Sequence, residues 1–509
     1  MNQGCLKATF FYIYPIIQCF FKMAMMAIRP SFFHFFQPFL VCFIAVFAAY
    51  AFSACSNSEI VEADVEGTAV IHSKDADTNI SSTQEKIITE KDSLRTDSAI
   101  TERTSMDSIC PPEVVCDTIQ KDLPLDDSEY PYAGIPRIVI ETENHQAIKD
   151  RETEIPAKLQ IWGASAPESE VMDLTIRGRG NTSWTEMPKK SYKIEFVNKQ
   201  EMLGMPKDRD WALIANYVDK TMMKNYLMYH LSAELGAYYA PRCTFTELYI
   251  NGEYLGVYLL TETVKIAKHR VNIPKNENSY LIEVDVRVKE DEQPIYSAIL
   301  MNDINKKAFR IHEPKNASKE LLSTIKNRIE SFERYLKTID PQKNNSIGQW
   351  IDVNEYIKHY WIQEFSKNPD ADFKTSVYFS WEKDSIMKMG PVWDFDLALG
   401  NRDKPRGLPP GWYIKPSYWN AFLFKDSILE HARIDYWTNH KDEFKRLSSK
   451  IDSVYLFLKS AAQNNYKRWN IEDSFKCSYN QDYYRSFEEA CEHLKEWIEQ
   501  RIDWIDTYD

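Results

Sequence analysis

The sequence predicts an α+β fold with two lobes, in which a strand-rich first half precedes a helix-rich second half. Between about residues 134 and 300, short apolar or alternating runs are separated by turn signals, as is typical of strands. After about residue 317, longer segments place apolar residues at helical spacing. Strands and helices that are segregated along the chain favour α+β over alternating βα units.

The chain before these elements has a different character. Residues 1–55 contain a basic residue, Arg29, then an apolar run and small residues that end at Cys55, which is the pattern of a secretory signal peptide with a lipobox-like end. We expect Cys55 to carry a lipid that anchors the protein to a membrane of the cell envelope, outside the cytoplasm. An uncleaved anchor helix and plain secretion are the alternatives. Residues 56–130 are polar, acidic and rich in Ser and Thr, and predict a disordered tether.

Net charge and cysteine spacing argue against two kinds of site, a broad nucleic-acid-binding surface and a zinc site. The 509-residue chain has a formal net charge of −13, which argues against a broad nucleic-acid-binding surface. Of nine cysteines, Cys110 and Cys116 are close enough in sequence to close a small disulfide loop in an oxidising compartment. No cysteine spacing resembles a zinc site.

Each strand is predicted from an apolar run bounded by turn residues. The segment 245–264 is a hairpin, because Asn251–Gly252 is a favoured two-residue turn between two strands. The other predicted strands lie within 135–144, 157–165, 171–184, 189–197 and 279–286.

The predicted helices repeat apolar residues three and four apart. The helix within 219–236 has Asp219 or Thr221 as its N-cap and Gly236 as its stop. We expect the helices after about residue 405 to form a C-terminal extension, residues 406–509, packed on the larger lobe. The other predicted helices lie within 319–339, 352–368, 444–465 and 487–508.

Two aspartates lie two residues apart in the run "GPVWDFDLALGN". The sequence predicts a strand, a turn and a second strand over 376–396. In a strand, Asp394 and Asp396 point to the same face. A half-buried carboxylate pair repels itself unless a proton or a cation lies between the two groups. The run therefore predicts a cation site.

A basic turn is the second candidate feature. Arg177, Arg179, Lys189 and Lys190 surround a Gly-x-Gly turn between two predicted strands. Exposed backbone N–H groups in such turns bind anions, and Arg or Lys adds charge and hydrogen-bond donors. The turn predicts a site for a phosphate-bearing ligand, with a basic surface hairpin as the alternative.

A third feature, "NPDADF", places Asn368, Asp370 and Asp372 after a predicted helix. Mg²⁺ is held by one or two carboxylates together with substrate phosphates. Phosphoryl transfer needs a lysine on the phosphates, a metal-binding aspartate and an aspartate that orients or deprotonates the acceptor hydroxyl. Lys190, Asp394 and Asp370 supply these groups. Turn-forming Asx residues, or the paired carboxylates of a glycoside hydrolase, are the alternatives.

Together these motifs resemble the CotH kinase family of spore-coat and surface proteins. The resemblance runs in consistent order from about residue 134 to 402, through "RGRGNTSW", "PKKSYKIEF", "NYVDKTMMKN", "NPDADF" and "GPVWDFDLALGN". It implies an atypical protein-kinase-like, two-lobed fold over residues 131–405. It also implies ATP- and divalent-metal-dependent phosphorylation of Ser or Thr hydroxyls on a protein substrate.

The resemblance assigns roles to individual residues. Lys190 looks like the lysine that binds the nucleotide phosphates, with Lys189 as its rival. Asp370 is similar to the catalytic aspartate, with Asp372 as its rival. Glu262 matches a recurrent family glutamate whose role does not follow from the sequence.

The metal site is implied in the same way. Asp394 takes the part of the metal-binding aspartate of a kinase DFG motif, with Asp396 in support, and the metal is Mg²⁺ or Mn²⁺. Arg177 and Arg179 are expected on the nucleotide phosphates. Thr375 departs from the asparagine that some members have there, which leaves the number of metal ions open.

We therefore expect a lipid-anchored phosphotransferase of secreted or surface proteins. A protein outside the cytoplasm meets little ATP, so two other functions stay open. One is a non-catalytic surface or adhesion module on the same fold, and the other is a carboxylate-based glycan hydrolase.

Overall fold

A computed structural model describes residues 122–289, 292–301, 306–402, 405–470 and 484–509. The predicted signal peptide, Cys55, Cys110, Cys116 and most of the predicted tether lie outside the described residues. Within the described ranges, no helix is both long and apolar enough to cross a membrane.

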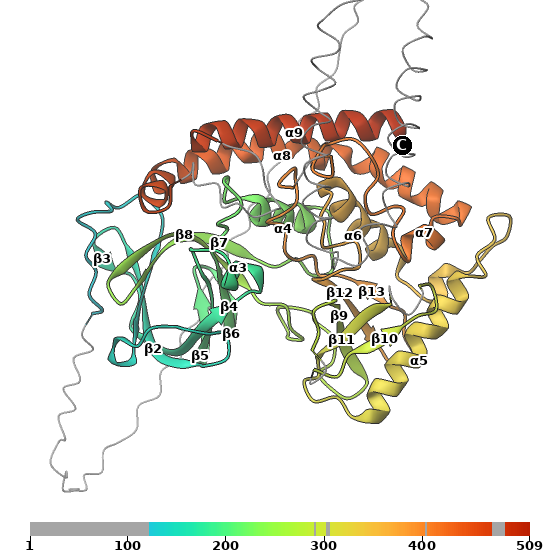
Figure 1. The fold of residues 1–509 in the computed structure, drawn as a ribbon, viewed down its shortest axis with the longest axis horizontal. Coiled ribbons are helices and arrows are strands. Elements are labelled where there is room, and N and C mark those ends of the chain that lie inside the picture. Colours follow the sequence, from blue (N-terminus) through green and yellow to red (C-terminus); the bar gives the residue numbers. More distant parts are fainter. Residues whose placement is uncertain (1–121, 290–291, 302–305, 403–404, 471–483) are drawn as a thin grey trace, which may run out of the picture. The chain divides into compact units, whose positions relative to one another are not determined.

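Seven strands close into a barrel, which confirms the strand-rich first half (Figure 1). Their order is β1-β7-β8-β6-β5-β4-β2, and β1 pairs with β2 to complete the ring, while the short β3 extends β2. Only the β1–β7 pair among these is parallel. The strands are β1 Arg137–Thr142, β2 Ile155–Gly163, β3 Ala166–Pro167, β4 Met172–Arg179, β5 Ser191–Met202, β6 Met205–Ile214, β7 Cys243–Ile250 and β8 Glu253–Glu262.

The barrel forms because alternate residues of its strands are apolar and meet in one core. On β5, Tyr192, Ile194 and Phe196 are buried there. The predicted β7–β8 hairpin is confirmed, and its turn residues Asn251 and Gly252 have φ values of 52° and 78°. Positive φ at both positions fits a two-residue turn whose twist matches the flanking strands.

A second, antiparallel sheet follows the barrel along the chain. Its strand order is β10-β11-β9-β12-β13. Helix α5 packs against β10, so one face of this sheet is buried in the helical core. The strands are β9 Ser279–Val284, β10 Ile295–Ser297, β11 Lys307–Glu313, β12 Val377–Glu382 and β13 Lys388–Met389.

The helices dominate the second half, so the α+β prediction is confirmed. Each of the long helices α5, α6, α8 and α9 starts at a side chain that accepts a backbone N–H, respectively Ser318, Asp352, Asp426 and Ser486. The helices are α3 Thr182–Thr185, α4 Lys224–Glu234, α5 Lys319–Leu336, α6 Val353–Ser366, α7 Asn420–Leu423, α8 Ser427–Arg468 and α9 Phe487–Tyr508, with short 3₁₀ turns at Glu143–His145 and Ile347–Gln349.

Helix α4 starts later than the sequence predicts. Its first residue is Lys224, so neither Asp219 nor Thr221 is the N-cap. Asp219 still acts on this helix start, because its carboxylate accepts the Lys224 N–H at 2.8 Å and the Thr221 N–H at 2.9 Å. The predicted stop is confirmed, since Gly236 follows the helix with φ +70°.

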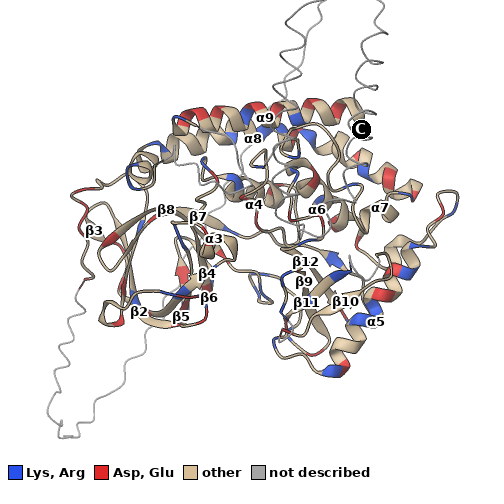
Figure 2. Ribbon diagram, viewed as in Figure 1, with Lys and Arg blue, Asp and Glu red and all other residues tan. Residues whose placement is uncertain are grey.

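The C-terminal helices α8 and α9 share the main core. Leu447 of α8 and Ile498 of α9 belong to the same buried cluster as Trp361 of α6. The predicted boundary at residue 405 therefore falls inside one core. Both helices carry charged residues, which on α9 are mostly Asp and Glu (Figure 2).

The packed region also begins earlier than the predicted tether allows. Leu123 is buried, and its N–H donates to the side-chain oxygen of Gln160 on β2 at 2.9 Å. Tyr130 stacks on Tyr254 of β8 with ring centroids 4.2 Å apart. Residues 122–130 are therefore part of the folded protein.

The C-terminal end of α8 contacts the barrel beside Gly256 of β8. Asn465 accepts the Val257 N–H at 3.1 Å, and Gly256 beside it has φ +96°. A Cβ at Gly256 would lie 2.5 Å from the Asn465 oxygen.

We expect Gly256→Ala to lower the free energy of unfolding by more than the strain of positive φ alone, which is about 1–2 kcal/mol. Gly204→Ala is the matched control, because Gly204 has φ +79° but open space around a Cβ. Urea unfolding measures both variants. Equal losses would show that the contact with Asn465 does not matter.

Candidate active site

A cavity of about 1340 Å³ opens between the barrel, the second sheet and the loops that follow α6 and β13. This volume exceeds that of a site for one drug-sized ligand, about 300–1,000 Å³. Twelve lining residues are Lys or Arg and nine are Asp or Glu. The lining is thus net positive in a chain of net charge −13.

Three predicted aspartates from two chain segments meet in this cavity. Asp370 comes from the loop after α6, and Asp394 and Asp396 come from the loop after β13. Burial, followed by the nearby charge of Asp394, raises the pKa of Asp370 to about 6. Burial also raises the pKa of Asp394, although Arg179 opposes the change. The pKa of Asp396 lies well above its usual range because of burial and then Asp394 and Asp370.

The shared strand predicted for Asp394 and Asp396 is wrong. Strand β13 ends at Met389, and no helix or strand includes these two aspartates. Asp394 has φ +66°, a left-handed conformation that strands do not contain. The apolar run is typical of a strand, but here it forms a mostly buried loop.

Side chains hold this loop in place of strand partners. Asn225 of α4 accepts the Phe395 N–H at 2.8 Å, and its own amide N–H donates to Asn216. Asn368 donates to the Asp394 carbonyl at 3.1 Å, and its oxygen accepts the Asp370 N–H at 3.2 Å. Asn368 therefore links the two segments that carry the aspartates.

We expect Asn225→Ala to lower the free energy of unfolding by about 1–3 kcal/mol, because it removes the partner of the buried Phe395 N–H and of the Asn216 side-chain oxygen. Thermal unfolding measures this loss. Asn278→Ala, at an exposed position, is the control and should be near neutral. A neutral Asn225→Ala would contradict the role of Asn225 in holding the loop.

The basic turn forms a second wall of the cavity, as predicted. Arg177 and Arg179 end β4, and both line the cavity. Arg177 is held by the Arg151 carbonyl at 2.6 Å. Arg179 lies over the Trp393 ring at 5.2 Å, next to Asp394. Among the four predicted basic residues, Arg179 is the one whose charge opposes the raised pKa of Asp394.

The two rival lysines do not present ammonium groups to this cavity. Lys190 is not among the lining residues, and its Nζ donates to the Trp184 carbonyl. Lys189 lines the cavity, but its Nζ donates to the Val257 carbonyl and, at 3.0 Å, to Asn465. Burial pulls the pKa of Lys189 well below its usual range. Their positions do not support a phosphate-binding role for either lysine.

Two other lysines line the cavity, but each forms an ion pair with a carboxylate there. Lys193 of β5 pairs with Asp210 at 2.8 Å, and Lys265 pairs with Asp210 and Asp208. These lysines outweigh the effect of burial and lower the pKa of Asp210. Net positive charge near the aspartates must therefore come from other residues.

Sequence reasoning missed Arg287. It follows β9, lines the cavity and pairs with Asp285 at 3.1 Å. Its guanidinium also donates to Thr375, five residues after Asp370. Arg287 comes directly after the predicted strand segment 279–286, but one arginine after a strand is not a specific signal.

The structure distinguishes Asp370 from its predicted rival and shows the surroundings of Glu262. Asp370 lines the cavity, whereas its rival Asp372 is not among the lining residues. Glu262 is fully buried in a structural cluster with Arg242, Arg270 and Tyr239. That cluster accounts for Glu262 without any ligand.

The donor set fits a hard divalent cation. Burial raises the pKa values of the Asp394 and Asp396 carboxylates, which favours binding of a cation that would stabilise their ionised forms. Within the described ranges, no three His, Cys, Asp or Glu side chains form a preassembled metal site. Two carboxylates are nevertheless sufficient for Mg²⁺ when substrate phosphates complete its coordination.

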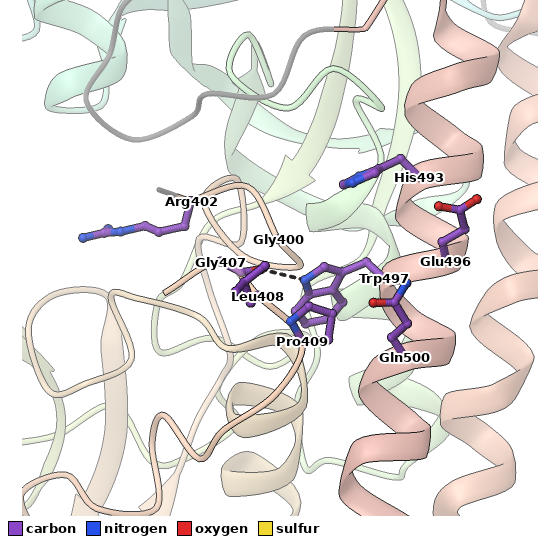
Figure 3. A pocket seen from close by; sticks show the side chains of 9 residues that line it. All are labelled: Gly400, Arg402, Gly407, Leu408, Pro409, His493, Glu496, Trp497 and Gln500. Carbon is purple, nitrogen blue, oxygen red and sulfur yellow. Dashed lines mark hydrogen bonds between the residues drawn. The ribbon is translucent and has the colours of Figure 1, made fainter. Parts of the chain in front are cut away.

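A second, smaller cavity of about 90 Å³ lies between α9 and the loop around Gly407 (Figure 3). The Trp497 side chain forms part of the cavity wall, and its indole N–H donates to the Gly407 carbonyl at 2.8 Å. His493, Glu496 and Gln500 lie along one side of α9. Its size admits a few waters rather than a nucleotide, so it is not the candidate active site.

Comparison with known families identifies one that covers more than half of the chain. The family model described as CotH kinase protein matches residues 176–505. This range includes the barrel strands from β4 onward, all three aspartates and nearly all of α9. Compared with curated proteins, the chain shows no match.

Proposed function

The chain belongs to the CotH kinase protein family, and from this premise we propose that it transfers phosphate from ATP to Ser or Thr hydroxyls of a protein substrate. The observation that carries the proposal is the convergence of Asp370 with Asp394 and Asp396 in one cavity with a net positive lining. The barrel and the sheet-plus-helix region would then correspond to the two lobes of a kinase-like fold.

Asp370 is the proposed base. It accepts the proton of the acceptor hydroxyl as that oxygen bonds to the γ-phosphorus, and the bond to the ADP oxygen breaks. A pKa of about 6 leaves Asp370 mostly ionised at neutral pH and still basic enough to take a proton.

Asp394 and Asp396 are the proposed ligands of Mg²⁺ or Mn²⁺, which when bound neutralises charge on the ATP phosphates. Arg179 lies beside Asp394 and is positioned to bind a phosphate oxygen. We assign the phosphate contact to Arg179 in preference to Lys190, because the Lys190 ammonium donates to a backbone carbonyl outside the cavity lining.

The predicted lipid anchor on Cys55, the extracytoplasmic location and the acceptor protein remain proposals. If the protein works outside the cytoplasm, a supply of ATP must reach it there, or its substrate must be met before export.

Nucleotide binding tests the reaction class. ATP with Mn²⁺ should raise the melting temperature of the protein, whereas ATP with a chelator should raise it much less. A glycan hydrolase or an adhesion module would show no shift in either condition. No shift at millimolar ATP and Mn²⁺ would therefore contradict the proposal.

A further inference from the structure

Arg287 is fixed in the cavity by two loops. Its Nε donates to Asp285 at 3.1 Å, and its Nη2 donates to the Thr375 hydroxyl. The Thr375 N–H in turn donates to the Asp370 carbonyl at 3.2 Å. The Val286 N–H donates to the Lys374 carbonyl at 2.8 Å, so the two loops run side by side. The arginine is therefore attached to the loop that carries the proposed base.

The charge of Arg287 acts on both catalytic segments. Burial alone would lower its pKa, but the carboxylates of Asp285, Asp370 and Asp394 outweigh burial and raise it. In return, Arg287 lowers the pKa of Asp370 and of Asp394. Its side chain is still 43% exposed, so the guanidinium can meet a ligand in the cavity.

Side-chain oxygens at the position where kinases bind a second metal ion already have hydrogen-bond partners within the protein. In protein kinases, an asparagine of the catalytic loop binds a second Mg²⁺. Here the candidate position is Thr375, whose hydroxyl donates to Asp285 at 3.2 Å and accepts from Arg287. The same oxygen of Asp285 also accepts the Arg287 N–H at 2.9 Å. Protein donors thus occupy the Thr375 hydroxyl and one oxygen of Asp285, two of the atoms that a second ion would use.

We propose that this site works with one divalent ion and that Arg287 supplies the second positive charge, in contact with the transferred phosphoryl group. The proposal rests on the phosphotransfer function above. In the step, the acceptor oxygen–phosphorus bond forms, the bond to ADP breaks and the proton passes to Asp370. Arg287 keeps its protons and stabilises charge on the equatorial phosphoryl oxygens.

The test compares Arg287→Ala with Arg334→Ala. Arg334 is an exposed arginine on α5 that pairs with Glu330, and it lies outside the cavity lining. We expect Arg287→Ala to lower kcat by at least on the order of 100-fold, with a smaller change in KM for ATP. Arg334→Ala should match wild type.

Metal binding gives a readout that does not depend on turnover. Wild type should bind one Mn²⁺ per chain in the presence of an ATP analogue whose γ-phosphate cannot be transferred. Without nucleotide, Arg287→Ala should bind Mn²⁺ more tightly than wild type, because a cation near Asp370 and Asp394 has been removed. Replacing an arginine that has only a structural role would not raise the affinity for Mn²⁺ while lowering kcat.

Arg287→Lys keeps the positive charge but loses the bidentate hydrogen-bonding geometry of the guanidinium. It is the variant to measure if Arg287→Ala does not fold. We expect it to lose on the order of tenfold in kcat. Two Mn²⁺ per chain in an active wild type, or wild-type turnover by the folded arginine variant, would overturn this inference and leave the proposed function intact. A wild type that neither binds nucleotide nor transfers phosphate would overturn both.

Discussion

Asp394→Asn is expected to abolish the binding of metal-bound ATP and, with it, all phosphate transfer. The substitution removes one of the two proposed carboxylate ligands while keeping the size and shape of the side chain. The loss should be large because no described group of three ligands can take over the ion. Asparagine is also compatible with the positive φ of Asp394, so the loop conformation is retained.

The measurement is the rise in melting temperature that ATP and Mn²⁺ produce. Wild type should show it and Asp394→Asn should not. Asp442→Asn, at a 77% exposed position on α8, controls for the loss of one negative charge. A normal shift in Asp394→Asn would place the metal elsewhere.

Asp370→Asn is expected to bind nucleotide as wild type does and to lose transfer. General-base catalysis contributes about 10²–10⁴-fold, so kcat should fall by that factor. The pH profile of wild type should report the same group. Its kcat/KM should fall below about pH 6, or lower when a bound cation offsets the charge of Asp394. Asp370→Asn should lack this fall.

A stability measurement separates the base from a structural role. The native pKa of Asp370 is raised to about 6, above the ordinary value of 3.8 for an aspartate. The stability that this difference provides is present below about pH 4 and is lost as pH rises through 6. At pH 8 without metal, the ionised wild-type side chain therefore costs stability.

Asp370→Asn should consequently be more stable than wild type at pH 8 by about 1–3 kcal/mol, with the difference shrinking toward pH 4. A variant that transfers phosphate at the wild-type rate would show that another group is the base. A variant that is inactive and also less stable at pH 8 would point to a structural role.

The sequence was sufficient for the elements whose residues carry strong local signals. The hairpin turn Asn251–Gly252 and the helix stop at Gly236 were predictable because each requires positive φ. Alternating or continuous apolar runs likewise identified the strands of the barrel except β6, for which no strand was predicted. Closure of that barrel through the β1–β2 pair was not predictable, because strand partners far apart in sequence leave no local mark.

The candidate site was predictable in its residue types and not in its geometry. The aspartates were identified by motif, but their loop is held by Asn225 and Asn368, which belong to other segments. Lys190 lies in the motif, yet its ammonium donates to the Trp184 carbonyl, a contact that the sequence does not reveal. Arg287 was missed because its role comes from tertiary contacts with Thr375.

The most direct test of the central claim is the transfer of labelled γ-phosphate from ATP by the purified protein with Mn²⁺ or Mg²⁺. Incorporation into the protein itself and into a Ser/Thr-rich acceptor would be measured beside Asp370→Asn and Asp394→Asn. The structure predicts label with wild type and none above background with either variant. Equal label in all three proteins, or none in a wild type that binds ATP, would contradict catalysis by this pair of aspartates.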